Sequence, residues 1–263
     1  MEYSIGQVSR LLGLSIEGIR NYEKSGIIQS HRPEDSNYRK YNYLDITSLI
    51  RARLYRALGY SLRETEALTN DSDIGDVRAM LNRRRAALTQ EIALAELTLR
   101  RLEALERSLE TLEGELGRVA FCDSPAICRI EFSRNCVIDF SAPAVAAFQR
   151  WMDWSPFIYV SSRYCRGDVY GGLAMDAEYA EPLGVEVDGR VARIPSRPSL
   201  RLTVAESENG FSDVGILQKL YDFADRHRLC LAEDMIGHTV IGVNKARDYR
   251  RYRRIYVEIL EEI

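Results

Sequence analysis

Seven aromatic residues crowd into positions 151–179 of this 263-residue chain. They are Trp151, Trp154, Phe157, Tyr159, Tyr164, Tyr170 and Tyr179. The face of an aromatic ring carries partial negative charge, so several rings together can enclose a cation. Any one of these rings is more commonly a core residue, and the cluster predicts a binding site only if a carboxylate lies close to it.

Four acidic residues are candidates for that carboxylate: Glu206, Glu233, Asp234 and Glu258. A buried carboxylate without a compensating cation has a raised pKa and stays neutral until a cation arrives. The sequence leaves open which of the four has this role. We predict a site for a cation, formed by Trp151, Tyr159, Tyr164 and Tyr170 together with these acids.

The remaining chemistry in the chain points away from catalysis. There is no phosphate-binding glycine loop, nucleophile elbow, HExxH or CxxC motif. The five cysteines are odd in number, so we expect reduced thiols rather than a disulfide framework. We therefore expect no catalytic residues, no cofactor and no resident metal.

Composition places the chain among soluble globular proteins. It is 46% hydrophobic and 29% charged, with a formal net charge of −3. No apolar run approaches the roughly 18 residues of a spanning helix, and the amino terminus lacks a targeting pattern, so we expect a cytoplasmic protein without a membrane partner.

Residues 1–70 carry ten Lys or Arg against eight Asp or Glu. This small excess suits DNA only if the basic residues share one face.

A long helix over residues 73–116 organises the rest of the chain. One apolar line recurs every seven residues, at Leu81, Leu88, Ala95, Leu102, Leu109 and Leu116, and a second contains Ile92, Leu99, Leu105 and Leu112. This heptad pattern is typical of a coiled coil. The residues between the lines are rich in Ala, Glu and Arg, which favour a helix.

Such a helix would be roughly 60 Å long, more than one small domain can cover. No second helix of similar length appears in the chain, so we expect another copy to bury the apolar line, which makes the protein a homodimer. The alternative is a long core helix of a monomer, which the charged residues on its other faces disfavour. The heptads alone leave the strand direction open.

Residues 4–26 have the pattern of two short helices joined by a tight turn. Ser4 and Gln7 form a capping pair, Gly13 ends the first helix and Ser15 caps the second. Any small helical hairpin could show this pattern. As a helix-turn-helix, however, it would place the second helix in the major groove of DNA. The side chains and backbone then available to DNA are those of Glu17, Gly18, Arg20, Asn21 and Lys24.

The segment of residues 31–41 is turn-rich in its middle and basic and aromatic at its end. Tyr38, Arg39 and Tyr41 suit a short strand whose side chains reach a sugar-phosphate backbone, so we expect a small wing. Two further helices are predicted at residues 44–58 and 62–68. Ser61 and Glu64 form the capping box of the second one.

Four segments in this part of the chain carry a family resemblance. They are Ile5-Gly6-Gln7-Val8-Ser9, Ile19-Arg20-Asn21-Tyr22-Glu23, Tyr38-Arg39-Lys40-Tyr41 and Leu58-Gly59-Tyr60-Ser61-Leu62. In order and spacing they resemble the MerR family of transcription regulators over residues 3–69, and the long helix resembles the family's antiparallel dimerisation coil. The resemblance implies a homodimer that binds double-stranded promoter DNA and acts on RNA polymerase indirectly, by distorting the promoter.

Carried over residue by residue, the resemblance implies base or groove contacts for Ser15, Arg20 and Asn21. It implies backbone contacts for Tyr22, Arg39 and Tyr41. Asn21 departs from the aromatic residue common at its position: it could pair with adenine, or it could be a solvated helix residue. The full set of predicted DNA-binding residues is Ser15, Gly18, Arg20, Asn21, Tyr22, Tyr38, Arg39, Tyr41 and Ser61.

The second half of the chain has the pattern of an α+β domain with a mainly antiparallel sheet. Strands are predicted at residues 126–132, 137–140, 157–162, 168–175, 189–194, 199–205, 236–243 and 252–259, and helices at 142–154 and 213–227. From residue 201 onward the layout resembles the gyrase-inhibitor-like (GyrI-like) ligand-binding fold. MerR family regulators with this domain resemble multidrug sensors in which aromatic side chains and a carboxylate hold a lipophilic cation or drug. His238 is a candidate for the place of that carboxylate.

A thiol-based, metal-responsive regulator of the same family is the alternative. Other members hold metals through cysteines at the ends of the dimerisation helix, and Cys122 and Cys128 lie just after it. No cysteine lies near residue 73, where the helix starts, and a whole domain follows that a metal sensor would not need. We therefore favour the drug-responsive interpretation.

Together these features predict a multidomain chain. Residues 1–70 form an all-α winged helix-turn-helix head that binds DNA. Residues 71–117 form a long antiparallel coiled-coil dimerisation helix. Residues 118–263 form an α+β effector-binding domain with an antiparallel sheet.

Overall fold

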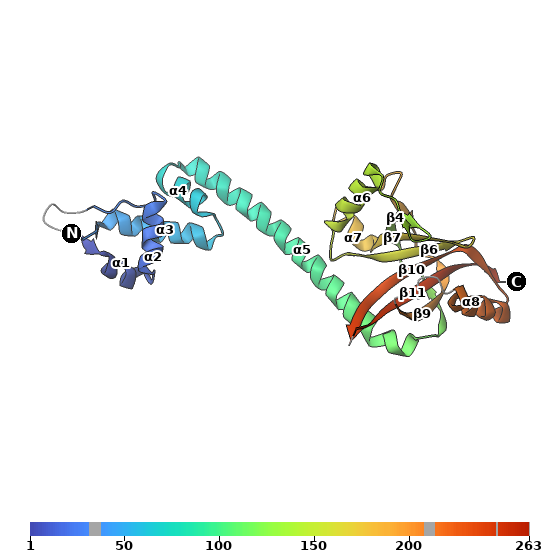
Figure 1. The fold of residues 1–263 in the computed structure, drawn as a ribbon. Helices are drawn as coiled ribbons and strands as arrows, with labels where there is room; N and C mark the ends of the chain where they lie inside the picture. The colour runs from blue at the N-terminus through green and yellow to red at the C-terminus, as the bar shows by residue number, and fades with distance from the viewer. Residues whose placement is uncertain (32–37, 208–213, 246, 263) are drawn as a thin grey trace. The chain divides into compact units, whose positions relative to one another are not determined.

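The structure is a computed structural model that describes residues 1–31, 38–207, 214–245 and 247–262, with the backbone alone for residues 214–216 and 262 (Figure 1). The chain divides into two compact units, Met1–Leu94 and Ala95–Ile263. Helix α5 (Ile74–Glu115) contributes its first half to one unit and its second half to the other. No helix in the described ranges is long and apolar enough to cross a membrane.

The first unit contains a helical head. Its elements are β1 (Tyr3–Ser4), α1 (Ile5–Leu12), α2 (Ile16–Lys24), β2 (Lys40–Tyr41), α3 (Tyr43–Ala57) and α4 (Leu62–Asn70). Both predicted capping boxes are present, at Ser4 with Gln7 and at Ser61 with Glu64. Gly13 ends α1 with φ +62°, a left-handed conformation that favours glycine, and Ser15 caps α2. The predicted helix-turn-helix is therefore confirmed.

A single apolar core holds α1, α2 and α3 together. Its buried residues are Val8, Ile19, Ile27, Ile28, Tyr41, Ile46, Leu49 and Ala52. Ile46, Leu49 and Ala52 recur at helical spacing, so α3 buries one stripe against this core. Ile27 and Ile28, in the turn after α2, complete this core. Ile19 is the buried residue of α2, and Arg20 and Asn21 next to it are exposed.

The predicted wing is described only at its ends, because residues 32–37 lie outside the described residues. Strand β2 has two residues and pairs antiparallel with β1. The head thus contains a small two-stranded sheet, and β2 lies where the sequence predicts a short strand. Tyr41 is fully buried in the core, so its prediction as a DNA contact is wrong. Tyr38, before β2, is by contrast exposed.

Helix α5 confirms the predicted long helix within one residue at each end. Much of its apolar surface is exposed in the single chain: Leu81, Leu88, Ile92, Leu94, Leu99, Leu102 and Leu109. Leu112 is instead buried within the second unit. Rows of exposed leucine at heptad spacing are the surface that a coiled-coil partner covers. Homodimer formation through this row remains a prediction.

The second unit is an α+β domain, as predicted. Its strands are β3 (Val119–Asp123), β4 (Ile127–Arg134), β5 (Val137–Ile138), β6 (Ile158–Cys165), β7 (Asp168–Asp176), β8 (Ala192–Ile194), β9 (Pro198–Ser207), β10 (Leu229–Lys245) and β11 (Asp248–Glu262). Its helices are α6 (Ala142–Met152), α7 (Ala177–Ala180) and α8 (Val214–His227). The sequence missed only the short elements β3 and α7. The fold class is therefore confirmed.

One antiparallel sheet contains all of these strands, in the order β3-β9-β11-β10-β6-β7-β4-β5, with β8 beside β4. The order shows an internal repeat. In β4-α6-β6-β7 and in β9-α8-β10-β11, the third strand of the repeat lies between the first and second. The two repeats meet where β10 pairs with β6, with His238 opposite Ser161.

The two faces of this sheet differ because side chains alternate along each strand. One face carries Leu173 and Met175 of β7, and Ile255 and Val257 of β11, and is packed against α6 and α8. We call it the helix face. The opposite face carries Arg129, Ser161, Arg163, His238, Arg254 and Tyr256, as the register and the side-chain contacts require. We call it the cavity face.

We predict that Leu88→Lys combined with Leu102→Lys converts the protein to monomers and abolishes DNA binding. Both residues lie exposed on α5, and two buried charges per chain would oppose a coiled-coil interface. Sedimentation equilibrium and an electrophoretic shift with operator DNA measure the two effects. Gln90→Lys adds the same charge on another face of α5 and should leave the dimer intact. A dimer that persists in the double variant would contradict the proposed role of α5.

Candidate functional site

Most of the residues predicted to contact DNA lie on and around α2. Arg20 and Asn21 are exposed there, and Arg20 makes only a loose contact with Glu17, with N and O 3.7 Å apart. Ser15 accepts a hydrogen bond from the Gly18 backbone N–H at 3.0 Å. A Cβ on Gly18 would lie 3.1 Å from that hydroxyl. Ser15 therefore packs closely against the amino-terminal end of α2, and the side chains of Arg20 and Asn21 are exposed to solvent.

The other predicted DNA contacts fall into three groups. Tyr38 is 79% exposed, and the Arg39 Nε lies 3.4 Å from the carboxylate of Glu23 on α2. This ion pair places Arg39 next to the recognition helix. Tyr22 is half-buried against the core, so only its outer part is available. Ser61 is exposed, but its hydroxyl accepts the Glu64 backbone N–H, so its first role is to cap α4.

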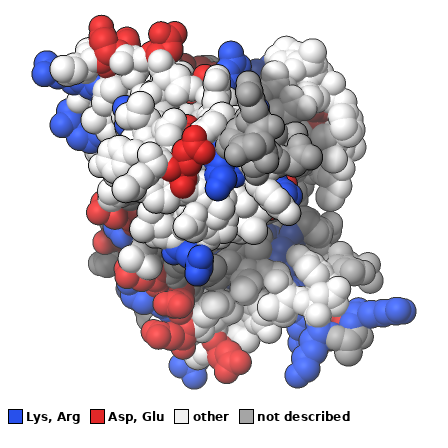
Figure 2. All heavy atoms as spheres, turned by 90° about the vertical axis from the view of Figure 1, so that its left-hand side faces the viewer, with Lys and Arg blue, Asp and Glu red and all other residues white. Residues whose placement is uncertain are grey.

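Basic residues do not form one extended patch on the molecular face in Figure 2. Lys and Arg groups there alternate with Asp and Glu groups, and uncharged surface separates them. This agrees with the small positive excess of residues 1–70. DNA binding would therefore depend on a few well-placed side chains more than on a strong general attraction.

The cavity face contains a pocket of about 230 Å³. It is lined by Ser124, Pro125, Ile127, Arg163, Ile194, Pro195, Arg197, Ser199, Ala232, Asp234, Ile236, His238, Tyr256 and Glu258. These residues come from β4, β6, β8, β9, β10 and β11 and their loops. The apolar residues give it the chemistry of a small-molecule site, and a few polar groups converge on it. We refer to it as the sheet cavity.

His238 lies at the wall of the sheet cavity between two tyrosines. Its ring centroid is 5.0 Å from that of Tyr159 and 5.2 Å from that of Tyr256. Burial, followed by the positive charges of Arg254, Arg253 and neighbouring Arg101, lowers the pKa of His238 to about 3. The imidazole is therefore neutral at physiological pH.

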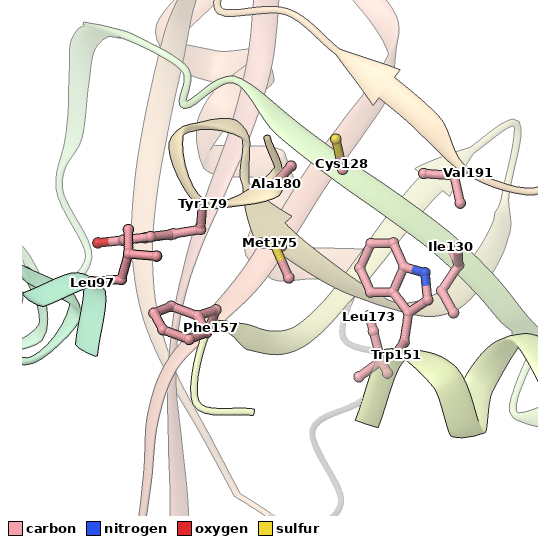
Figure 3. Packing of buried hydrophobic residues seen from close by; sticks show 10 residues of the cluster. All are labelled: Leu97, Cys128, Ile130, Trp151, Phe157, Leu173, Met175, Tyr179, Ala180 and Val191. Atoms are coloured by element: carbon pink, nitrogen blue, oxygen red, sulfur yellow. The ribbon is translucent and has the colours of Figure 1, made fainter. Parts of the chain in front are cut away.

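The predicted cluster of aromatic rings is not found around this cavity. Trp151, Phe157 and Tyr179 are instead buried in a hydrophobic core cluster that includes Leu97 of α5 (Figure 3). Tyr164 points to the helix face, where its hydroxyl accepts a hydrogen bond from Arg253 at 2.6 Å. The prediction of one aromatic cage is wrong. Tyr159 and Tyr164 are an odd number of positions apart on β6 and so point to opposite faces of the sheet, and Trp151 lies on α6.

Tyr159 and Tyr170 do lie on the cavity face, but each has a partner. The Tyr159 hydroxyl donates to Asp176 at 2.7 Å. The guanidinium of Arg163 lies over the ring of Tyr170, 4.1 Å from its centroid. An arginine of the chain therefore already occupies this cation–π position.

The four predicted acids all have arginine partners. Glu206 lies on the helix face, buried between Arg251 and Arg253. The remaining three pairs join Glu233 to Arg166 at 2.9 Å, Asp234 to Arg163 at 3.4 Å, and Glu258 to Arg197 at 3.7 Å. The predicted uncompensated buried carboxylate is thus absent from these positions. Only Asp234 and Glu258 line the sheet cavity.

The sequence analysis missed the arginines that provide this compensation. Arg129, almost fully buried, donates to Ser161 at 3.2 Å and to the Tyr170 carbonyl at 2.7 Å, and it pairs with Glu131. Burial raises the pKa of Glu131, but hydrogen bonds from Arg163 and Arg129 outweigh it and the pKa is lowered. The alternation of charged residues along the predicted strand 126–132 was the available signal.

A second charged cluster ties the end of α5 to the cavity face. Glu115 lies 3.0 Å from Arg201 and 3.1 Å from Arg254, and accepts a hydrogen bond from Thr203 at 3.2 Å. Arg254 also donates to Thr111 and Ser108, about one and two turns before Glu115 in α5. Burial raises the pKa of Glu115, but its hydrogen bonds and the two arginines outweigh this and lower it. We call these groups the α5 clamp.

The thiols give little support to the metal alternative. Cys128 is buried in the helix-face core, whereas Cys122 lies on β3, and burial raises the pKa of both thiols. A raised pKa disfavours the thiolate that binds a soft metal. Within the described part of the chain, no group of three or more His, Cys, Asp or Glu residues is placed to hold a metal ion.

The head and its long helix are those of a helix-turn-helix regulator, and comparison with known proteins specifies the family. The family described as "MerR family regulatory protein" matches residues 4–41. CueR of Vibrio cholerae, an HTH-type transcriptional regulator, is 32% identical over 117 residues, which cover 43% of this chain and 84% of CueR. The chain belongs to the MerR family.

Other relatives are more distant or match over less of their length. TipA of Streptomyces coelicolor, an HTH-type transcriptional activator, is 29% identical over 110 residues; the match spans 42% of this chain and 42% of TipA. The structure of the EcmrR–DNA complex covers 98% of this chain and all of that chain, at 18% identity and a TM-score of 0.39. TipA and CueR are named as transcription regulators, in agreement with the expectation that this chain is not an enzyme.

We predict that acid destabilises the second unit through His238. The pKa is about 3 in the folded chain, against about 6.5 when unfolded. The unfolded chain therefore binds the proton first, and the contribution to stability is present above pH 6.5 and lost as pH falls toward 3. Burial raises the pKa of the neighbouring Tyr159 and Tyr256, so these two phenols stay protonated over this range. Relative to His238→Phe, the wild-type free energy of unfolding should drop by about 2 kcal/mol between pH 7 and 5. Urea unfolding followed by Trp fluorescence reports this unit, because both tryptophans, Trp151 and Trp154, lie in it. If the unfolding free energies of the wild type and His238→Phe changed with pH in the same way, the assignment would be contradicted.

We also predict that Arg254→Gln loosens the last turns of α5. The substitution removes the ion pair with Glu115 and weakens the hydrogen bonds to Ser108 and Thr111. The side chains of Arg254 and Glu115 are largely shielded from water, so these contacts should contribute more than those of an exposed pair. Amide exchange over residues 105–115 should accelerate by about tenfold or more, measured by mass spectrometry. Arg250→Gln, which loses only an exposed pair with Asp248, is the matched control. Unchanged exchange in Arg254→Gln would show that the clamp does not hold the helix.

Proposed function

We propose that this protein is a DNA-binding transcription regulator. It binds promoter DNA as a homodimer and responds to a small lipophilic ligand held in the sheet cavity. RNA polymerase responds indirectly, through the twist and bend that the dimer imposes on the promoter. The observation that carries the proposal is the geometry of the head, a capped helix-turn-helix with Arg20 and Asn21 exposed on its second helix.

The division of labour on the DNA follows from this geometry. Arg20 and Asn21 extend from the recognition helix toward base edges, where arginine pairs with guanine and asparagine with adenine. Arg39 and Tyr38, from the segment before β2, contact the backbone beside it. Gly18 and Ser15 bring the start of the helix close to a phosphate. Ser61 contributes in the same way at the start of α4.

The homodimer is proposed from α5. Its exposed leucines need a second copy to bury them, and two heads held by one coil would present two recognition helices to the half-sites of a palindrome. Antiparallel pairing is the arrangement that the family resemblance implies. The three-part division into residues 1–70, 71–117 and 118–263 assigns DNA binding, dimerisation and ligand binding to successive segments.

The ligand signal is proposed to leave the cavity along β11. Tyr256 and Glu258 line the cavity, and Arg254, two residues before Tyr256 on the same face, belongs to the α5 clamp. A ligand that shifts β11 would therefore act on the end of the dimerisation helix. If the ligand bound more tightly to one of two orientations of that helix, it would favour that orientation and so change the twist and bend of the promoter.

We predict that Arg39→Ala weakens binding to specific and random DNA by similar factors. Arg20→Ala should also relax the preference at one position in each half-site, by about 1–3 kcal/mol, because base contacts specify while backbone contacts position. Competition binding against operators substituted at each position measures both effects. Arg85→Ala on α5 is a control with the same change of charge. If Arg39→Ala altered the preference at a single base, the two assignments would have to be exchanged. Wild-type protein that binds no DNA selected from a random pool would overturn the proposed function.

A further inference from the structure

The sheet cavity has no negative charge to spare for a cation. Its lining contains two arginines and two acids, and they are paired: Arg163 with Asp234 and Arg197 with Glu258. Arg163 also donates to Glu131, at 2.7 Å. A cationic ligand would lose its hydration and gain no free carboxylate in return, so it would have to break an existing pair.

The wall of the cavity is instead suited to a neutral polar group. His238 is neutral and lies between the rings of Tyr159 and Tyr256. Its Nδ1 is buried and has no hydrogen-bond partner among the residues that the structure describes. A neutral imidazole offers one donor and one acceptor, and a buried nitrogen without a partner is unfavourable until one arrives.

The rest of the lining selects an apolar, flat molecule. Ile127, Ile194 and Ile236 line the cavity together with Pro125 and Pro195. The rings of His238 and Tyr256 both line the cavity, so an aromatic ligand can pack against them. An anion gains no free partner here either, because both arginines of the lining are already paired.

We propose that the sheet cavity binds an uncharged, hydroxylated aromatic compound and that His238 recognises its hydroxyl group. The inference rests on the proposed role of this cavity as the ligand site. It departs from the lipophilic cation that the sequence predicts. The aromatic ring of the ligand packs on the isoleucines, and the hydroxyl exchanges a hydrogen bond with the imidazole.

Four naphthalene compounds with one ring system test this by calorimetry on the full chain at pH 7: 2-naphthol, 2-naphthoate, 2-naphthylmethylamine and 2-methylnaphthalene. We expect 2-naphthol to bind at least about tenfold more tightly than the ammonium or the carboxylate, because each charged compound must be desolvated without a partner. Equal or tighter binding of the ammonium compound would overturn the proposal, as would the absence of 2-naphthol binding.

The residue assignment is tested with His238→Phe, which keeps a ring between the tyrosines. It should weaken 2-naphthol about fivefold and leave 2-methylnaphthalene unchanged. Should this variant fail to fold, the wild-type chain provides a second measurement, since it contains only three histidines. The side-chain nitrogen resonances of His238 should shift with 2-naphthol and not with 2-methylnaphthalene. Equal shifts would overturn the role of His238.

The outcome separates this inference from the proposed regulator function. If 2-naphthol binds as expected but DNA binding is insensitive to Arg20→Ala and Arg39→Ala, the ligand class stands and the proposed DNA contacts fail. If the DNA variants behave as expected and the ammonium compound binds best, the regulator stands and the ligand class fails.

Discussion

The α5 clamp is the interaction on which the proposed mechanism depends. Glu115 brings two arginines from neighbouring strands, Arg201 of β9 and Arg254 of β11, onto the end of a 42-residue helix. The groups are only partly accessible to water, so their attraction is screened less than that of a surface pair. Together with the buried Leu97 and Leu112, this contact holds the second half of the helix on the domain, so a change in the sheet can reach the coil.

The same sheet separates packing from recognition by the parity of its residues. Leu173, Met175, Ile255 and Val257 face the helices and supply the hydrophobic core. Their neighbours in sequence face the other way and are charged or aromatic. A buried charge is tolerated only with a partner, so Glu131, Asp234 and Glu258 on the cavity face each have an arginine beside them. Because this pairing leaves no net charge for a ligand, shape and hydrogen bonding decide what the cavity accepts.

Local signals made the head and the long helix predictable. The capping boxes at Ser4 and Ser61, Gly13 in a left-handed turn, and the heptads of α5 each act over a few residues of the chain. Strand positions in the second half were also predictable from alternation. The short α7 was missed because four residues carry too little periodicity, and β3 because it directly follows the helix.

The candidate ligand site could not be predicted in the same way, because its charges are paired across the sheet. Arg163 and Asp234 are 71 residues apart, and Arg253 and Glu206 are 47 apart. Aromatic residues close in sequence were assigned to one site, yet Trp151 and Tyr159 lie on opposite faces. The arginine-rich run Arg250-Arg251-Tyr252-Arg253-Arg254 carried the missing signal, since cations in a predicted buried strand require nearby acids.

A neutral ligand would also change how the signal is produced. A cation could act at a distance by attracting a carboxylate, but an uncharged ring acts only on the groups that it touches. In this cavity those groups include Tyr256, whose strand also carries Arg254 of the α5 clamp. Tyr256 and Arg254 are two residues apart on β11 and share a face of the sheet. A ligand that displaces the backbone at Tyr256 would therefore also displace the side chain of Arg254. The response would then depend on packing between the ligand and β11, and the clamp would convert that packing into a new setting of the long helix.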